Sequence, residues 1–108
     1  MITVDHLEAC HRATRLALEI HRKWSSEDES KLLERSLQLK GLIEPFFVLI
    51  EGEWPRQKNL KRHAGVLCSN LQNGRQEDSR CDIDDLVYDD LPSLTTQLLR
   101  LYREQSTS

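Results

Sequence analysis

Residues 5–43 read DHLEACHRATRLALEIHRKWSSEDESKLLERSLQLKGLI and carry two successive apolar patterns of helical period. The first pattern spaces its apolar side chains three or four positions apart, which puts them on one face of a helix: Leu7, Cys10, Ala13, Ala17, Ile20 and Trp24. The opposite face is polar and mostly basic: Arg12, Arg15, Glu19, Arg22 and Lys23. The second pattern runs from Leu32 to Ile43. We therefore predict a helix over about residues 5–24, followed at once by a second helix.

Each pattern is preceded by a signal for the start of a helix. Asp5 and Ser26 are each followed three residues later by a glutamate, a capping-box arrangement in which both side chains bond free backbone N–H groups of the first turn. The link between the two helices is then only a few residues long, which favours antiparallel neighbours. We predict that the two helices form an αα-hairpin.

Two prolines divide the following part of the chain. Pro45 lacks a backbone N–H and its ring clashes with the preceding turn, so we predict that the second helix kinks or ends near Ile43 and Glu44. Pro55 suits the first turn of a helix, and we predict a third helix over about residues 55–73. Its apolar stripe is narrow: Leu60, Ala64, Leu67 and Leu71.

The last third of the chain differs in composition from the first two. Residues 75–85 are polar and charged with a single isoleucine, too little apolar surface to offset the entropy of ordering, so we predict a mobile linker there. Residues 1–74 are predicted to form a helical core, and residues 86–108 an acidic segment and a C-terminal helix that packs on the same domain. The predicted fold is all-α, a small helical bundle. The chain has 108 residues, 38% of them apolar, so it can build only a modest core. A dimer that shares a larger core is therefore an alternative to the monomer.

Charge is distributed unevenly along the chain. The net charge of −3 combines a body of +2 over residues 1–75 with a tail of −5 over residues 76–108. A body this weakly basic lacks the basic stripe of a dedicated nucleic-acid binder. The longest apolar run, Phe46 to Ile50, is too short to span a membrane, and the first residues lack the basic and apolar regions of a signal peptide. We expect a cytoplasmic protein with no membrane partner.

Large apolar side chains beside the predicted helix break are candidate anchors for a partner, because aromatic residues dominate binding energy at interfaces. They are Phe46, Phe47, Ile50 and Trp54. Leu86 and Tyr88 lie between two pairs of aspartates, next to the aliphatic-acidic run over residues 82–85, a composition that suggests a docking segment that folds on binding. The favoured function is an adaptor, chaperone or regulatory subunit that presents an apolar groove to a partner helix or to a second copy of itself. Ordinary core packing is the alternative for the first four residues, and an aspartate-rich helix start for the last two.

The most basic stretch of the chain lies on the predicted third helix. Its positive or potentially positive side chains are Arg56, Lys58, Lys61, Arg62 and His63. This basic face supports a second hypothesis, a nucleic-acid-binding accessory protein that holds phosphates there. It equally suits the acidic tail of the same chain, and a contact between residues 82–90 and residues 56–62 makes the tail a lid over the basic face.

Arg56 and His63 stand seven residues apart on this predicted helix, and Arg15 and His21 show a similar spacing. The pattern resembles the Arg-x(4–6)-His element of the HEPN ribonucleases, whose helical bundles are of similar size. The resemblance implies a histidine that acts as general base and an arginine that stabilises the phosphate. The polar residue that commonly follows the arginine is matched by Gln57 but is absent after Arg15. A HEPN-like ribonuclease is the less favoured alternative, and no catalytic residue is assigned.

The cysteines and aspartates show no metal-binding pattern. Cys10, Cys68 and Cys81 stand at wide spacing that matches neither a disulfide framework nor a zinc motif, so we predict free thiols, with Cys10 in the core. The acidic run over residues 82–85 has too few ligands for a calcium loop and lacks its turning glycine. We predict no metal and no cofactor.

Overall fold

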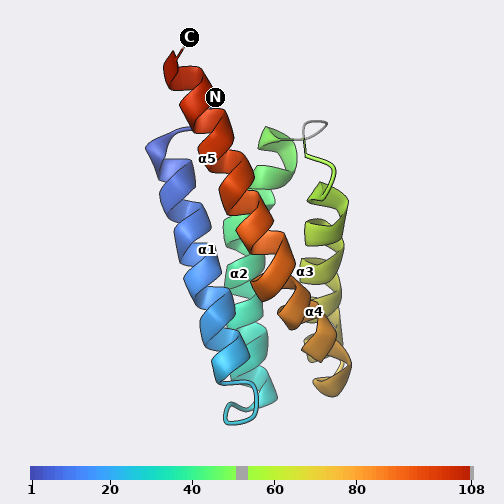
Figure 1. Ribbon diagram of the computed structural model, residues 1–108. Helices are drawn as coiled ribbons and strands as arrows, with labels where there is room; N and C mark the ends of the chain where they lie inside the picture. The colour runs from blue at the N-terminus through green and yellow to red at the C-terminus, as the bar shows by residue number, and fades with distance from the viewer. Residues whose placement is uncertain (51–53, 108) are drawn as a thin grey trace.

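Four long helices lie side by side in an elongated bundle of 48 × 21 × 19 Å in the computed structural model (Figure 1). The structure describes residues 1–50 and 54–107, with side chains up to Gln105. The long helices are α1 (Val4–Arg22), α2 (Glu29–Leu49), α3 (Gln57–Gln72) and α5 (Leu91–Thr107). Three short elements join α3 to α5: η1 (Glu77–Ser79), α4 (Arg80–Asp85) and η2 (Leu86–Asp90). The predicted all-α bundle is confirmed.

The first two helices form the predicted antiparallel hairpin, but each cap differs from the expected one. The Thr3 hydroxyl accepts from the His6 backbone N–H at 3.4 Å, and the Thr3 N–H donates to His6 Nδ1 at 3.0 Å. This reciprocal box starts α1 slightly before the Asp5 start that the sequence predicted. For α2, the Asp28 carboxylate accepts from the Lys31 backbone N–H at 2.9 Å, so that helix begins slightly after Ser26.

Pro45 lies inside α2 and does not end it. The helix continues to Leu49, so the end predicted near Ile43 and Glu44 is wrong, while the kink stays a prediction. A proline at this position leaves the carbonyl of Gly41 without its helical partner. Gly41 and Pro45 are both exposed, so water can satisfy that carbonyl on the outer side of the helix. The continued helix carries Phe46 and Ile50 inward.

Residues 75–85, predicted to be a linker, contain η1 and α4. Ser79 and Ile83 are fully buried, and the side-chain amide of Gln76 donates to the backbone carbonyl of Trp24 at 2.8 Å. The prediction of a mobile linker was wrong because it considered only the apolar surface that residues 75–85 themselves supply. Ile83 instead enters a core that α1 and α3 already supply, and α4 continues directly into η2 and α5, so little further ordering is needed.

The core runs through all the long helices and through the α4–η2 segment. Its largest fully buried side chains come from every part of the bundle: Ile20, Leu32, Leu39, Ile43, Phe46, Ile50, Leu60, Leu67, Ile83, Leu86, Leu91 and Leu94. Within residues 1–50 and 54–107, no helix combines the length and the apolar character that a membrane span requires.

Candidate functional site

Four of the six predicted partner anchors lie in the core of the bundle. Phe46, Ile50, Trp54 and Leu86 are buried within the chain itself, so they do not form an exposed binding surface. The interpretation as ordinary core packing holds for these four, because α2 continues through the proline and carries the apolar segment against the other helices. Of the remaining two anchors, one is half-buried and one, Tyr88, is 69% exposed.

Phe47 packs on the core from its edge, and its backbone carbonyl accepts from the side-chain amide of Gln57. Tyr88 stands on η2 with its ring edge-on to His21, at a centroid distance of 5.4 Å. The predicted anchors are therefore not brought together on one surface. Tyr88 alone among them is widely open to solvent.

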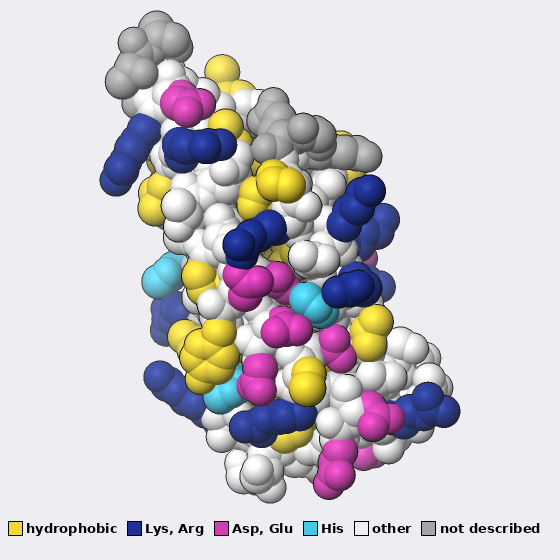
Figure 2. Space-filling model, turned by 45° about the vertical axis from the view of Figure 1, so that its right-hand side comes forward, with side chains coloured by type: hydrophobic (Ala, Val, Ile, Leu, Met, Phe, Trp, Pro, Cys, Tyr) yellow, Lys and Arg dark blue, Asp and Glu magenta, His cyan; other side chains and the backbone are white. Residues whose placement is uncertain are grey.

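The predicted basic face of α3 meets the acidic segment of its own chain. Figure 2 shows acidic side chains gathered on the middle of one face of the molecule, bordered by Lys and Arg side chains. Arg56 forms an ion pair with Asp89 and donates to the Ser93 hydroxyl at 3.1 Å. His63 is buried against two further aspartates. Lys58, Lys61 and Arg62 remain exposed.

His63 is held between two carboxylates. Its Nδ1 lies 2.6 Å from Oδ2 of Asp90, which is fully buried, and its Nε2 lies 3.3 Å from Oδ2 of Asp85. Burial raises the pKa of the Asp90 carboxyl above its usual value, and the hydrogen bond with His63 opposes that shift. This triad fastens the start of α5 to α3.

The π-helical turn η2 makes this arrangement possible. Asp85 and Asp90 are five residues apart, and in an α-helix of 3.6 residues per turn two such side chains diverge around the axis. Hydrogen bonds from residue i to i+5 widen the turn and bring positions five apart toward the same side. Pro92 lies just beyond, and its missing N–H cannot pair with the Tyr88 carbonyl in the α-helical pattern. Both carboxylates thereby reach one imidazole ring.

In the two Arg/His pairs that resemble the HEPN element, Arg56 and both histidines are engaged by carboxylates, whereas Arg15 is not. Both ring nitrogens of His63 face aspartates, and Arg56 pairs with Asp89. His21 pairs with Asp84, with 2.9 Å between Nε2 and Oδ1. A general base needs a free nitrogen directed at the proton it removes. The geometry favours a structural role for these groups.

No cluster of three metal-binding side chains occurs in the described part of the chain. Cys10 and Cys68 are buried free thiols, as predicted for Cys10, and Cys81 is an exposed one. Burial raises the pKa of the Cys10 and Cys68 thiols, which keeps both in the unreactive protonated form.

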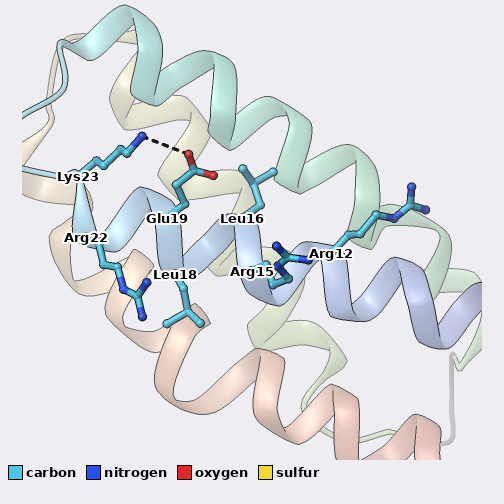
Figure 3. Close-up of a pocket in the computed structure, with 7 residues that line it drawn as sticks. All are labelled: Arg12, Arg15, Leu16, Leu18, Glu19, Arg22 and Lys23. Carbon is cyan, nitrogen blue, oxygen red and sulfur yellow. Dashed lines mark hydrogen bonds and ion pairs between the residues drawn. The ribbon is translucent and has the colours of Figure 1, made fainter.

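A second basic face lies on α1, and sequence reasoning had recorded it only as the polar side of that helix. An open hollow of about 660 Å³ lies over α1. Figure 3 shows the residues that line it: Arg12, Arg15, Leu16, Leu18, Glu19, Arg22 and Lys23. Glu19 is engaged by Lys23 at 3.3 Å and by Arg35 of α2 at 2.6 Å. The side chains of Arg12, Arg15 and Arg22 have no hydrogen-bond or ion-pair partner among the residues that the structure describes.

An apolar groove adjoins this face, between α1 and α5. Its volume is about 270 Å³, and its lining comes from both helices: Leu7, Cys10, His11 and Thr14 of α1, and Thr95, Leu98 and Leu99 of α5. A further open hollow of about 430 Å³ shares Leu7 and His11 with the groove. It also includes Arg12, the first of the residues that line the hollow in Figure 3. The groove and the hollow lined by the arginines thus lie side by side on the outside of α1 and overlap along the helix, the groove from Leu7 to Thr14 and the hollow from Arg12 to Lys23.

Comparisons of the chain with family models, with curated proteins and with solved structures give no match. The functional argument therefore rests on the fold and on the surfaces just described.

Proposed function

We propose that this protein is an adaptor, chaperone or regulatory subunit that binds a helix of a partner protein in the α1–α5 groove. One observation carries the proposal: two antiparallel helices leave between them an open groove whose sides are leucine side chains. Leu99 is 38% exposed and Leu7 is half-buried, so an apolar face laid into the groove removes both from water. An amphipathic helix in an apolar groove is a recurrent mode of protein recognition.

The hydroxyl and thiol groups of the groove are already satisfied within the chain. The Thr14 hydroxyl donates to the Cys10 carbonyl at 2.9 Å, and the Thr95 hydroxyl donates to the Leu91 carbonyl at 2.9 Å. The Cys10 thiol lies 3.3 Å from the Thr95 hydroxyl. The other polar residue of the lining, His11, is exposed. Most of the binding energy of a partner therefore comes from apolar burial, about 25 cal/mol per Å² of surface removed from water.

The proposed groove differs in place from the one that the sequence predicted. Three of the residues expected to form that surface, Phe46, Ile50 and Trp54, lie in the core. The α1–α5 groove instead uses leucines that the sequence assigned to helix packing. The class of function stays the same, and the residues change.

The test compares two leucines that are both exposed but lie on different faces. Leu99→Asp places a charge in the groove, and Leu37→Asp places the same charge on α2, where the leucine is 52% exposed. A photo-crosslinking amino acid at position 99 or 37 reports the position of the partner. We expect proteins captured from nuclease-treated source cells to bind the wild type and Leu37→Asp equally, and to crosslink from position 99 only. Far-UV circular dichroism checks that both variants remain folded.

Capture that survives Leu99→Asp unchanged, or crosslinks of equal yield from positions 37 and 99, contradicts the groove as the binding site. Loss of every captured protein on nuclease treatment moves the function to nucleic-acid binding.

A further inference from the structure

We infer that the partner helix is acidic along one flank and that Arg12, Arg15 and Arg22 bind its carboxylates. This inference rests on the proposed function, because it names the chemistry of the helix that occupies the α1–α5 groove. It adds a requirement that the groove alone does not impose.

The arginines lie beside the groove on the same helix. At about 100° of turn per residue, Arg15 and Arg22 stand roughly 60–80° from Leu7 around the axis of α1. The two linings overlap along the helix, because the groove uses residues from Leu7 to Thr14 and the hollow uses residues from Arg12 to Lys23. A partner helix of about 16 residues laid in the groove therefore has the arginines along one flank.

The three guanidinium groups are free to bind a partner, because the one acidic side chain among them is already neutralised. Glu19 is bound by Lys23 and by Arg35, and the hydrogen bond from Lys23 lowers the pKa of its carboxyl. It is therefore ionised and occupied at neutral pH. The face keeps its positive charge through the arginines, which are all exposed.

The spacing of the arginines suits the carboxylates of a helix. Arg12, Arg15 and Arg22 are separated by three and seven residues, so they lie on the same side of α1. A partner helix with acidic residues at the same intervals presents one carboxylate to each arginine, and guanidinium groups match carboxylates in geometry.

A half-buried leucine among the arginines favours a protein over a nucleic acid. In Figure 3 Leu18 and Arg22 lie on one side of α1, opposite Glu19 and Lys23 on the side of α2. Leu16, two residues before Leu18, points to nearly the opposite side of the helix. An apolar helix face laid beside Arg22 covers Leu18, whereas a phosphate backbone leaves that side chain in water. No aromatic side chain lines the hollow to stack a base.

The first arm of the test uses a displayed library of 18-residue helical peptides with a fixed leucine face and randomised flanks. It is selected on the wild-type protein, on Leu99→Asp, on the double variant Arg12→Glu/Arg15→Glu, and on Lys31→Glu as an exposed charge control on α2. We expect wild-type selections to depend on Leu99 and to be enriched in Asp and Glu on one flank. We expect the double variant to lose this enrichment and Lys31→Glu to keep it.

The second arm measures affinities for the best selected peptide. Replacing its flank acids by Gln weakens binding to the wild type about tenfold at low salt, because three exposed ion pairs each contribute modestly. The loss is smaller at high salt and is absent with Arg12→Glu/Arg15→Glu.

The outcomes separate the two proposals. Peptides that depend on Leu99 but show no acidic flank overturn the acidic-partner inference and leave the groove function standing. Absence of any peptide that depends on Leu99 overturns both. A 20-base-pair duplex that binds the wild type more tightly than the selected peptides, and loses binding with Arg15→Glu but not with Lys31→Glu, assigns the arginine face to nucleic acid and overturns the inference.

Discussion

The basic faces on α3 and on α1 contain similar residues but differ in whether acidic side chains of the same chain are paired with them. On α3, Arg56 and His63 are paired with aspartates of the η2 region. On α1, Arg12, Arg15 and Arg22 have no partner within the described residues. The difference comes from topology, because the aspartates of the acidic segment meet the side of α3 that carries Arg56 and His63, whereas the segment reaches α1 at His21, near the end of that helix. A count of positive charges therefore does not reveal which face is available to a partner.

The largest expected effect is on the buried pair of the α3 face. His63→Ala leaves the buried Asp90 carboxyl without its hydrogen-bond partner, and an unsatisfied buried polar group costs about 1–3 kcal/mol of folding free energy, more if it is charged. Urea unfolding measures this loss, with Arg62→Ala, an exposed neighbour on α3, as the control. A loss below about 1 kcal/mol shows that the His63–Asp90 contact does not hold the bundle together.

The pH dependence of stability distinguishes the two faces by sign. The folded-state pKa of Asp90 is raised by burial above the usual 3.8, so the folded chain binds this proton more tightly than the unfolded chain. The contribution of Asp90 to stability is present below about pH 4 and is lost as pH rises through its folded pKa. Asp90→Asn removes this part of the profile. Urea unfolding of both proteins from pH 4 to pH 7 measures the difference.

Glu19 on α1 serves as the opposite case. The hydrogen bond from Lys23 lowers its pKa below 4.5, so its contribution is present above the unfolded pKa and is lost as pH falls through the folded one. Glu19→Gln therefore alters the profile on the acid side and in the opposite direction. Profiles of the same sign for Asp90→Asn and Glu19→Gln contradict the contrast between the two faces.

A smaller effect is expected for the exposed pair on α3. The side chains of Arg56 and Asp89 are both about half exposed, so Arg56→Ala is expected to cost about 0.2–1 kcal/mol, and less at high salt. Unfolding in low and high salt tests this. If Arg56→Ala lowers the free energy of unfolding as much as His63→Ala does, the Arg56–Asp89 pair anchors the acidic segment as strongly as the His63–Asp90 contact.

The smallest effect is expected on α1. Arg15→Ala removes an exposed charge with no partner in the described part of the chain, so the free energy of unfolding is expected to change by no more than about 0.5 kcal/mol. The same variant is expected to weaken the binding of acidic helical peptides. Strong destabilisation by Arg15→Ala, measured by urea unfolding, shows that the α1 face is already engaged within the chain.

Sequence reasoning found the helices but not the groove that we propose as the binding surface. The period of residues 7–43 predicted the hairpin of α1 and α2, and the stripe from Leu60 to Leu71 predicted α3. These patterns are local, because an amphipathic helix carries its own apolar spacing. The candidate groove escaped notice because Leu7 and Leu99 are ordinary helix-face residues until the packing of α1 on α5 leaves them open.

The amino-acid sequence alone determined that this chain is helical, where its main helices lie and which side of each is apolar. Only the tertiary structure decided that Phe46 and Ile50 are core, that residues 77–85 are helical, and that Asp85 and Asp90 meet at His63. The physical reason is the distance along the chain over which each property is set. Helical periodicity is set by neighbours three or four residues away, whereas burial and charge pairing depend on residues brought together from distant parts of the chain.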